Sequence, residues 1–111
     1  MRLYVVVRAD LPPGLQCAQA CHAARAFRDP PDADENLIVL STRHDRLLQL
    51  EQAAALEGWP HVTFHEPDLG GELTAMALPG TPEVTVILRH LPLALRDSPQ
   101  LSHLTDLIDS V

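Results

Sequence analysis

A glutamine and a histidine form the pair of side chains best placed to do chemistry. Gln19 and His22 stand in AQACHA, residues 18–23. Residues three apart on a helix share a face, so the two side chains can act together. Imidazole titrates near neutral pH, which makes His22 the candidate general base of the chain. The alternative is a structural histidine on a surface or half-buried face.

Two carboxylates form a second candidate group. Glu66 and Asp68 stand in EPDLGG, residues 66–71, directly after an expected strand. Carboxylates at the end of a strand can orient a base or a water, or bind an ammonium group. Turns are also rich in such residues, so the alternative is an Asx turn at Asp68 and a solvated charge at Glu66.

The turn between the first strand and the first helix is a candidate ligand site. It contains LPPG, residues 11–14, and the expected ligand site runs from Asp10 to Gln19. Ligands of α/β proteins bind outside the carboxyl ends of strands. Gly14 lets the backbone approach a ligand closely, and the free N–H groups that begin a helix favour an anion. The alternative is that the Pro-Pro-Gly sequence only turns the chain.

These residues need a framework, which the apolar pattern predicts. Strands are expected at 3–8, 37–40, 61–65 and 73–78, and helices at 15–27 and from Thr42 to Glu57. Thr42 and Asp45 resemble a capping box, and Gly58 is a typical helix stop. On the first helix, the side of Cys17, Ala20, Cys21, Ala24 and Phe27 is expected to pack on the sheet.

The end of the chain is less regular. Thr81-Pro82-Glu83 favours a helix start, because proline fits the first helical position. The β-branched run 84–87 allows a strand there instead. A last amphipathic helix is expected after Ser98-Pro99, with Leu101, Leu104, Leu107 and Ile108 on one side.

The order of elements predicts the fold class. Helices alternating with apolar strands indicate an α/β protein with a sheet covered on both faces, that is, three α/β/α layers. The last two strands should pair antiparallel across their short turn, which makes the four-stranded sheet mixed. The 111 residues fit one domain.

Charge and composition narrow the function classes. The formal charge is −7, with eight arginines and no lysine, which counts against general binding of DNA or other nucleic acid. No apolar run is long enough to span a bilayer, and the first residues lack a signal-peptide pattern, so the expected location is the cytoplasm. Cys17 and Cys21 are too few for a zinc site, and no zinc motif is present, so no metal is expected.

Taken together, these segments resemble the type-2 peptidyl-tRNA hydrolase family. YVVVRADL, residues 4–11, resembles the family's opening V-V-R-x-D-L, and AQACHA resembles its A-Q-x-x-H-A helix. The sequence GWPH, residues 58–61, and the strand LTAMAL, residues 73–78, resemble later parts of the family pattern. The resemblance covers about residues 3–80, with 81–111 as a helical tail.

The resemblance implies both a fold and an activity. Family members have a mixed four-stranded sheet with helices on both faces, and are often homodimers. They hydrolyse the ester that joins a peptide to the terminal ribose of tRNA, which recycles tRNA from stalled translation, and no cofactor is implied. The implied catalytic group is His22 with Gln19 and with Glu66 or Asp68.

The chain departs from the family pattern at two turns. The family carries Gly-Lys just before the helix, whereas Gly14 is followed here by Leu15. With no lysine in the chain, its role in substrate binding is lost or falls to an arginine such as Arg8 or Arg25. The family's D-A-G-x-T-Q turn is replaced by EPDLG, and Glu66 matches the family aspartate by strand register. The alternative function is therefore a non-catalytic module that binds a protein or a small anion on the same fold.

Overall fold

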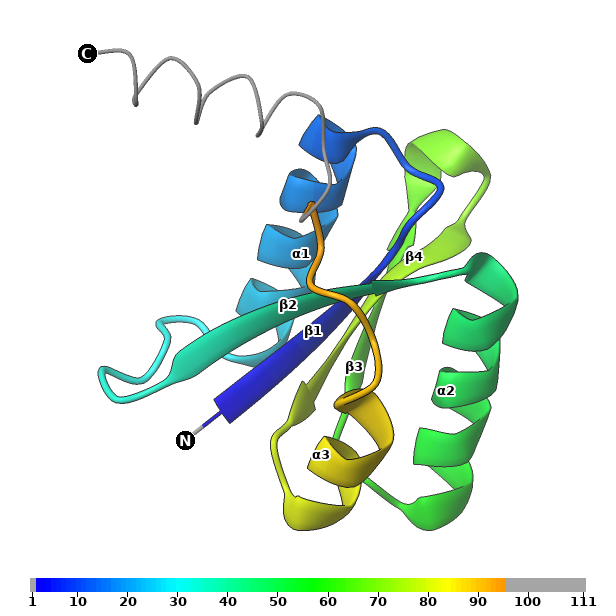
Figure 1. Ribbon diagram of the computed structural model, residues 1–111. Coiled ribbons are helices and arrows are strands. Elements are labelled where there is room, and N and C mark those ends of the chain that lie inside the picture. Colours follow the sequence, from blue (N-terminus) through cyan, green and yellow to red (C-terminus); the bar gives the residue numbers. More distant parts are fainter. Residues whose placement is uncertain (1, 96–111) are drawn as a thin grey trace, which may run out of the picture.

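A mixed four-stranded sheet forms the centre of the protein in a computed structural model, which describes residues 2–95 (Figure 1). The strands are β1 (Arg2–Arg8), β2 (Asn36–Thr42), β3 (Val62–Glu66) and β4 (Glu72–Pro79), in the order β2-β1-β4-β3. β1 pairs parallel with β2 and antiparallel with β4, and β3 pairs antiparallel with β4. The prediction of an α/β fold with a mixed four-stranded sheet is confirmed.

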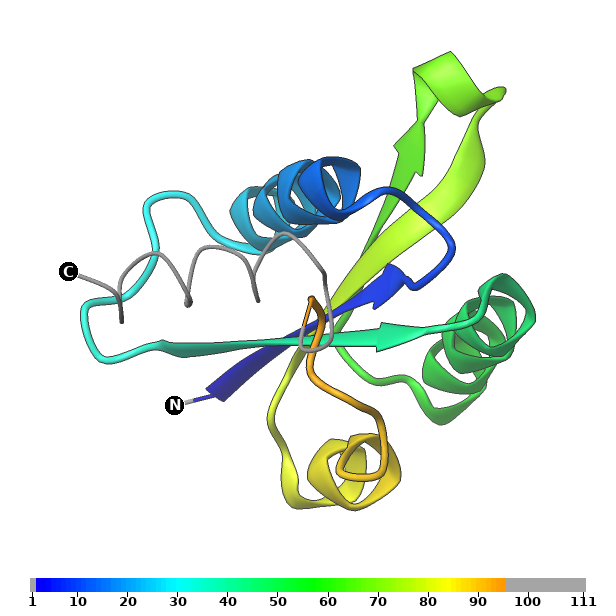
Figure 2. The ribbon, with the colours of Figure 1, turned by 45° about the horizontal axis from the view of Figure 1, so that its top comes forward.

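Helices cover both faces of the sheet (Figure 2). α1 (Pro13–Phe27) lies on one face, and α2 (His44–Glu57) and α3 (Pro82–Leu88) lie on the other. Alternate side chains of β1 point to opposite faces of the sheet. Val5 and Val7 pack with α1, whereas Val6 packs with α2 and α3. Because β1 is buried on both faces, its sequence is a continuous apolar run, as expected for a central strand.

The buried face of α1 differs from the predicted one. Gln16, Gln19, Ala20 and Ala23 face the sheet, whereas Cys17 and Cys21 are free and exposed. The prediction that the two cysteines pack on the sheet was therefore wrong. Both ends of the Gln19 amide and the nitrogen of the Gln16 amide find partners, whereas the Gln16 amide oxygen is buried without one. The Gln16 amide, for example, donates to the carbonyl of Leu11 at 2.7 Å.

The start of α2 also differs from its prediction. The N-cap is Arg43 rather than Thr42, and no side chain caps the helix. Thr42 belongs to β2, where it pairs with Arg8, and its carbonyl accepts the Ala9 N–H at 2.8 Å. The sheet thus retains the backbone of Thr42, and the helix begins two residues later. The predicted stop at Gly58 is confirmed, since this residue is the left-handed C-cap at φ 69°.

The structure decides between the two interpretations of residues 81–87 in favour of a helix. The Thr81 hydroxyl accepts the Val84 N–H at 3.3 Å, and Pro82 opens α3. After α3 the chain returns to β2, where the Ala94 N–H donates to the Val39 carbonyl at 2.9 Å. The helix expected after Ser98 lies outside the described residues. Among residues 2–95, no helix is long and apolar enough to cross a membrane.

Candidate functional site

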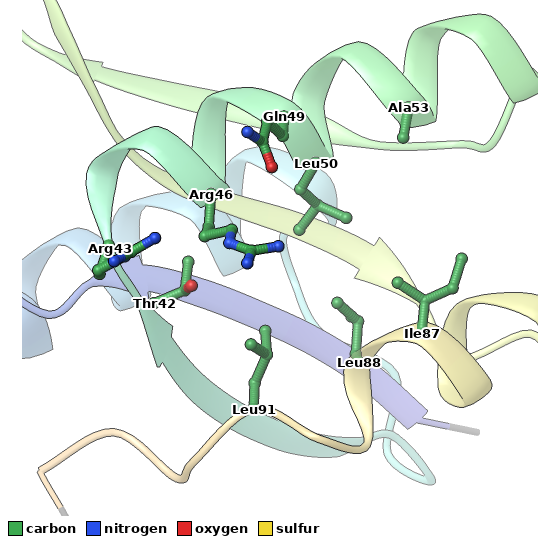
Figure 3. A pocket seen from close by; sticks show the side chains of 9 residues that line it. All are labelled: Thr42, Arg43, Arg46, Gln49, Leu50, Ala53, Ile87, Leu88 and Leu91. Carbon is green, nitrogen blue, oxygen red and sulfur yellow. The ribbon is translucent and has the colours of Figure 1, made fainter.

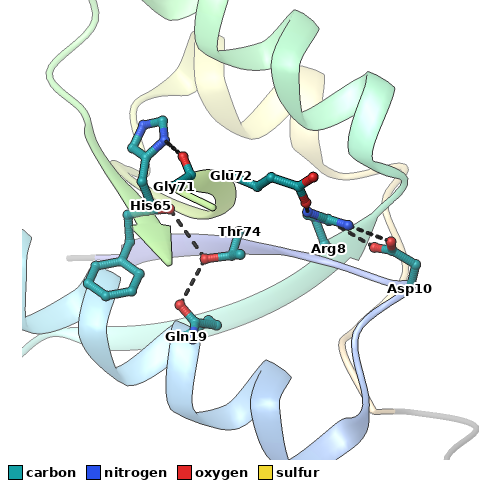
Figure 4. Close-up of polar contacts among 8 residues, drawn as sticks. Arg8, Asp10, Gln19, His65, Gly71, Glu72 and Thr74 are labelled. Atoms are coloured by element: carbon teal, nitrogen blue, oxygen red, sulfur yellow. Dashed lines mark hydrogen bonds and ion pairs between the residues drawn. The ribbon is translucent and has the colours of Figure 1, made fainter. Parts of the chain in front are cut away.

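Gln19 is the buried centre of the candidate site, with only 1% of its surface exposed. Its amide nitrogen donates to the Glu66 carboxylate at 2.7 Å. Its amide oxygen accepts the Thr74 hydroxyl at 2.8 Å, as Figure 4 shows. Because an ionised carboxylate only accepts hydrogen bonds, the N–H end of the amide must point at Glu66, and the oxygen end then faces the Thr74 hydroxyl. α1 and the β3–β4 turn are therefore joined by one polar chain.

A β-bulge in the sheet aims Thr74 at α1. The pairing of β3 with β4 shifts between Phe64 and His65, which leaves Thr74 as the extra residue of β4. Ala75 packs in the layer under α1, and Thr74 reaches Gln19 in that same layer. Two successive residues thus point toward one face, which a regular strand does not allow. Bulges commonly redirect a side chain in this way next to a site.

Glu66 is held as a carboxylate by two donors. Besides the Gln19 amide, the Asp68 backbone N–H donates to its other oxygen at 3.2 Å and begins the 3₁₀ turn η1 (Pro67–Leu69). These bonds lower the pKa of Glu66, the Gln19 bond most, and the nearby charge of His22 lowers it further. Glu66 is therefore ionised at neutral pH. The side chain of Asp68 is exposed, and its contact with Glu66 is through the backbone.

His22 lies on the exposed side of α1, near enough for its charge to act on this carboxylate but with no hydrogen bond or ion pair to it. Its ring stacks on the ring of Phe64, with centroids 4.7 Å apart and planes 13° apart. Phe64 precedes Glu66 by two residues on β3, so the same strand orients the imidazole and supplies the carboxylate. An oriented imidazole with a carboxylate nearby has the components of a general base. The structure thus brings together the predicted residues Gln19, His22 and Glu66.

Arg8 is the centre of a second polar group, which lies at the carboxyl end of β1 (Figure 4). Its guanidinium donates to both oxygens of Asp10, at 3.0 and 2.6 Å, and to Glu72 at 2.6 Å. The pKa of Arg8 is raised and that of Asp10 is lowered, in each case chiefly by their hydrogen bond. Arg8 is only 7% exposed. Arg8 and Asp10, both predicted to bind substrate, are thus engaged with each other.

The other two predicted substrate-binding residues lie at the surface of α1. Gly14 is exposed, and a Cβ built on it would meet nothing within 4 Å, so space is open above the first turn. Arg25 is also exposed, and its guanidinium lies 3.4 Å from Asp29. Three positions separate His22 from Arg25, which places both on one side of the helix.

Three contributors to this region were not predicted from the sequence: Phe64, Glu72 and Thr74. A threonine inside the apolar run LTAMAL was the available signal for Thr74, since a polar residue in a buried strand requires a partner. Glu72 pairs with Glu66 across the two strands, so its bond to Arg8 anchors the β3–β4 turn to β1.

Within residues 2–95, no group of three or more His, Cys, Asp or Glu side chains could hold a metal ion. Two surface hollows lie along α2 and α3, and none of the predicted site residues lines either one. The candidate site therefore lies outside these two hollows, at the carboxyl ends of β1 and β3.

Comparison with known proteins adds no family assignment. No protein-family model matches the chain, and no curated protein matches it either.

Proposed function

We propose that the protein hydrolyses the ester bond of a peptidyl-tRNA, or of a related aminoacyl ester, and releases free tRNA. One observation carries this proposal: Gln19 holds an ionised Glu66 within the electrostatic range of an exposed His22, whose ring is oriented by stacking. The AQACHA and VVRADL sequences supply the substrate class through their resemblance to the type-2 peptidyl-tRNA hydrolases.

In the proposed reaction, His22 acts as the base. The imidazole takes a proton from a water molecule, and the water oxygen attacks the ester carbonyl carbon. Glu66 stabilises the imidazolium that forms, while Gln19 and the Asp68 N–H keep this carboxylate in place. When the tetrahedral intermediate collapses, the bond from carbon to the ribose oxygen breaks, and His22 returns its proton to that oxygen.

Substrate binding is proposed for the open start of α1. Backbone N–H groups after Gly14 would hold a phosphate or the developing oxyanion. Arg25 would meet a phosphate of the acceptor end, because it lies on the same side of α1 as His22. Arg8 and Asp10 would contribute by fixing the loop that leads into the helix.

The test is release of tRNA from a labelled peptidyl-tRNA by the wild type and His22→Ala. We expect turnover by the wild type and loss of about a hundredfold or more in the variant, the range of general base catalysis. His90→Ala is the matched control, since His90 is exposed beyond α3 on the other layer. Full activity in His22→Ala would refute the role given to this histidine.

A second candidate function is a non-catalytic module that binds a protein or a small anion at the same surface. The observation that favours it is the engagement of Arg8 with Asp10 and Glu72, in a chain without lysine. Absence of turnover by well-folded wild type would favour this function over hydrolysis. A cytoplasmic homodimer is part of the leading proposal, and sedimentation of the purified chain tests the dimer.

A further inference from the structure

A hollow of about 560 Å³ lies between α2 and α3, on the face of the sheet opposite α1 (Figure 3). Leu50 and Leu88 form its buried floor, and Ile87, which is 48% exposed, forms part of an apolar wall. Small-molecule sites commonly have volumes of roughly 300–1,000 Å³ and a mainly apolar lining. The hollow therefore has the size and lining of a ligand site.

The cationic groups of the hollow lie at one end. Thr42, Arg43 and Arg46 line this end, where β2 leads into α2 (Figure 3). The two guanidinium groups give it positive charge, whereas the chain as a whole carries −7. A hollow with an apolar lining and a cationic end is complementary to a ligand that has an apolar body and an anionic head.

Arg46 is the cation that is available to a ligand. Within residues 2–95, it takes part in none of the salt bridges found, whereas Arg8, Arg25, Arg28 and Arg43 each have a carboxylate partner. The Arg43 pair with Asp45 is exposed on both sides and 3.2 Å long, so it exchanges readily with water or with another anion.

We propose that this hollow binds a small amphiphilic anion, with its charged head at Arg46 and Arg43. Its apolar body would lie against Leu50, Leu88 and Ile87. A single carboxylate on an alkyl chain is the simplest ligand of this class. The site is separate from the proposed ester hydrolase site, since α1, His22 and Glu66 belong to the other layer and to the β3–β4 turn.

Calorimetry of the full-length protein with decanoate tests the proposal, with decanol as the uncharged probe of the same chain length. We expect one site for decanoate and weaker binding of decanol. Arg46→Gln should weaken decanoate about tenfold or more, which corresponds to the loss of one charge-assisted hydrogen bond. Ala53→Leu should abolish binding by filling the hollow, because Ala53 lines it.

The matched control is Arg89→Gln, which makes the same charge change at the end of α3 in a residue that does not line the hollow. It should bind decanoate like the wild type, and circular dichroism checks that each variant is folded. Equal binding of decanoate and decanol, or equal weakening by Arg46→Gln and Arg89→Gln, would overturn the proposal. So would the absence of decanoate binding by the folded wild type.

Discussion

At the scale of single residues, Thr74 holds the oxygen end of the Gln19 amide, whose nitrogen end is bound by Glu66. Its hydroxyl is fully buried and donates to the Gln19 amide oxygen. Thr74→Val keeps the shape but leaves that oxygen without this donor, so we expect a loss of about 1–3 kcal/mol in the free energy of unfolding. Turnover should fall with it, because the Gln19 amide is then free to rotate away from Glu66.

Urea unfolding and the hydrolysis assay measure the two effects. Thr74→Ser is the matched control, since it retains the hydroxyl and should remain closer to the wild type in both measurements. If Thr74→Val matches the wild type in stability, the orienting bond has no energetic role.

The charge of Glu66 depends on the same chain of contacts. Gln19→Leu removes the strongest influence on this carboxylate, so its pKa should rise toward the ordinary value of 4.5. A lowered folded pKa contributes stability above the unfolded value, and this contribution is lost as the pH falls through the folded pKa. Stability should therefore fall less steeply in acid for Gln19→Leu than for the wild type.

A carbon NMR titration of the side-chain carboxyl groups measures the shift directly. Gln49→Leu, an exposed change on α2, serves as the control and should leave the Glu66 titration as in the wild type. An unchanged Glu66 titration in Gln19→Leu would show that the amide does not hold this charge.

At the scale of elements, Arg8 joins three segments of the chain where the strands β1 and β4 meet the loops. It stands at the end of β1, binds Asp10 before α1 and binds Glu72 at the start of β4. Lysine cannot reproduce this forked geometry, so we expect Arg8→Lys to lower the free energy of unfolding by about 1–2 kcal/mol. Thermal unfolding in parallel with Arg25→Lys provides the comparison, since the exposed Arg25 pair should change stability by only about 0.5 kcal/mol or less. Equal effects of the two variants would contradict the structural role of Arg8.

Helices and strands were predictable where a single local sequence signal determines the backbone conformation. The apolar run of β1, the left-handed Gly58 and Pro82 after a capping threonine each act within a few residues. The first turn of α2 was misplaced because the pairing of Thr42 with β1 overrides its capping tendency. That pairing joins segments far apart in the sequence, which local patterns do not report.

The candidate site was predictable to a similar extent. The spacing of Gln19 and His22 identified the helix, and Glu66 was identified from its place after a strand. The roles of Thr74 and Glu72 depend on a bulge and on pairing across the sheet, so sequence alone did not indicate them. The buried face of α1 was mispredicted for the same reason, because Gln19 is buried through a partner on β4.

At the scale of the whole molecule, net charge sets how RNA can be bound. A chain with charge −7 and no lysine offers few cations to phosphates, so contacts to RNA should be few. Each neutralised phosphate contributes about −0.7 to −0.9 to the slope of log K against log salt concentration. With Arg25 as the proposed contact, the slope for an acceptor-stem RNA should be shallow, about −1.

Fluorescence polarisation of a labelled acceptor-stem RNA over a salt series measures this slope. Arg25→Gln should reduce its magnitude by about 0.7–0.9, the contribution of one phosphate. Arg89→Gln makes the same charge change on the opposite layer and should leave the slope unchanged, because recognition is proposed at the start of α1. Equal slopes for the two variants would mean that RNA responds only to net charge, and the substrate surface would then have to be placed elsewhere on the molecule.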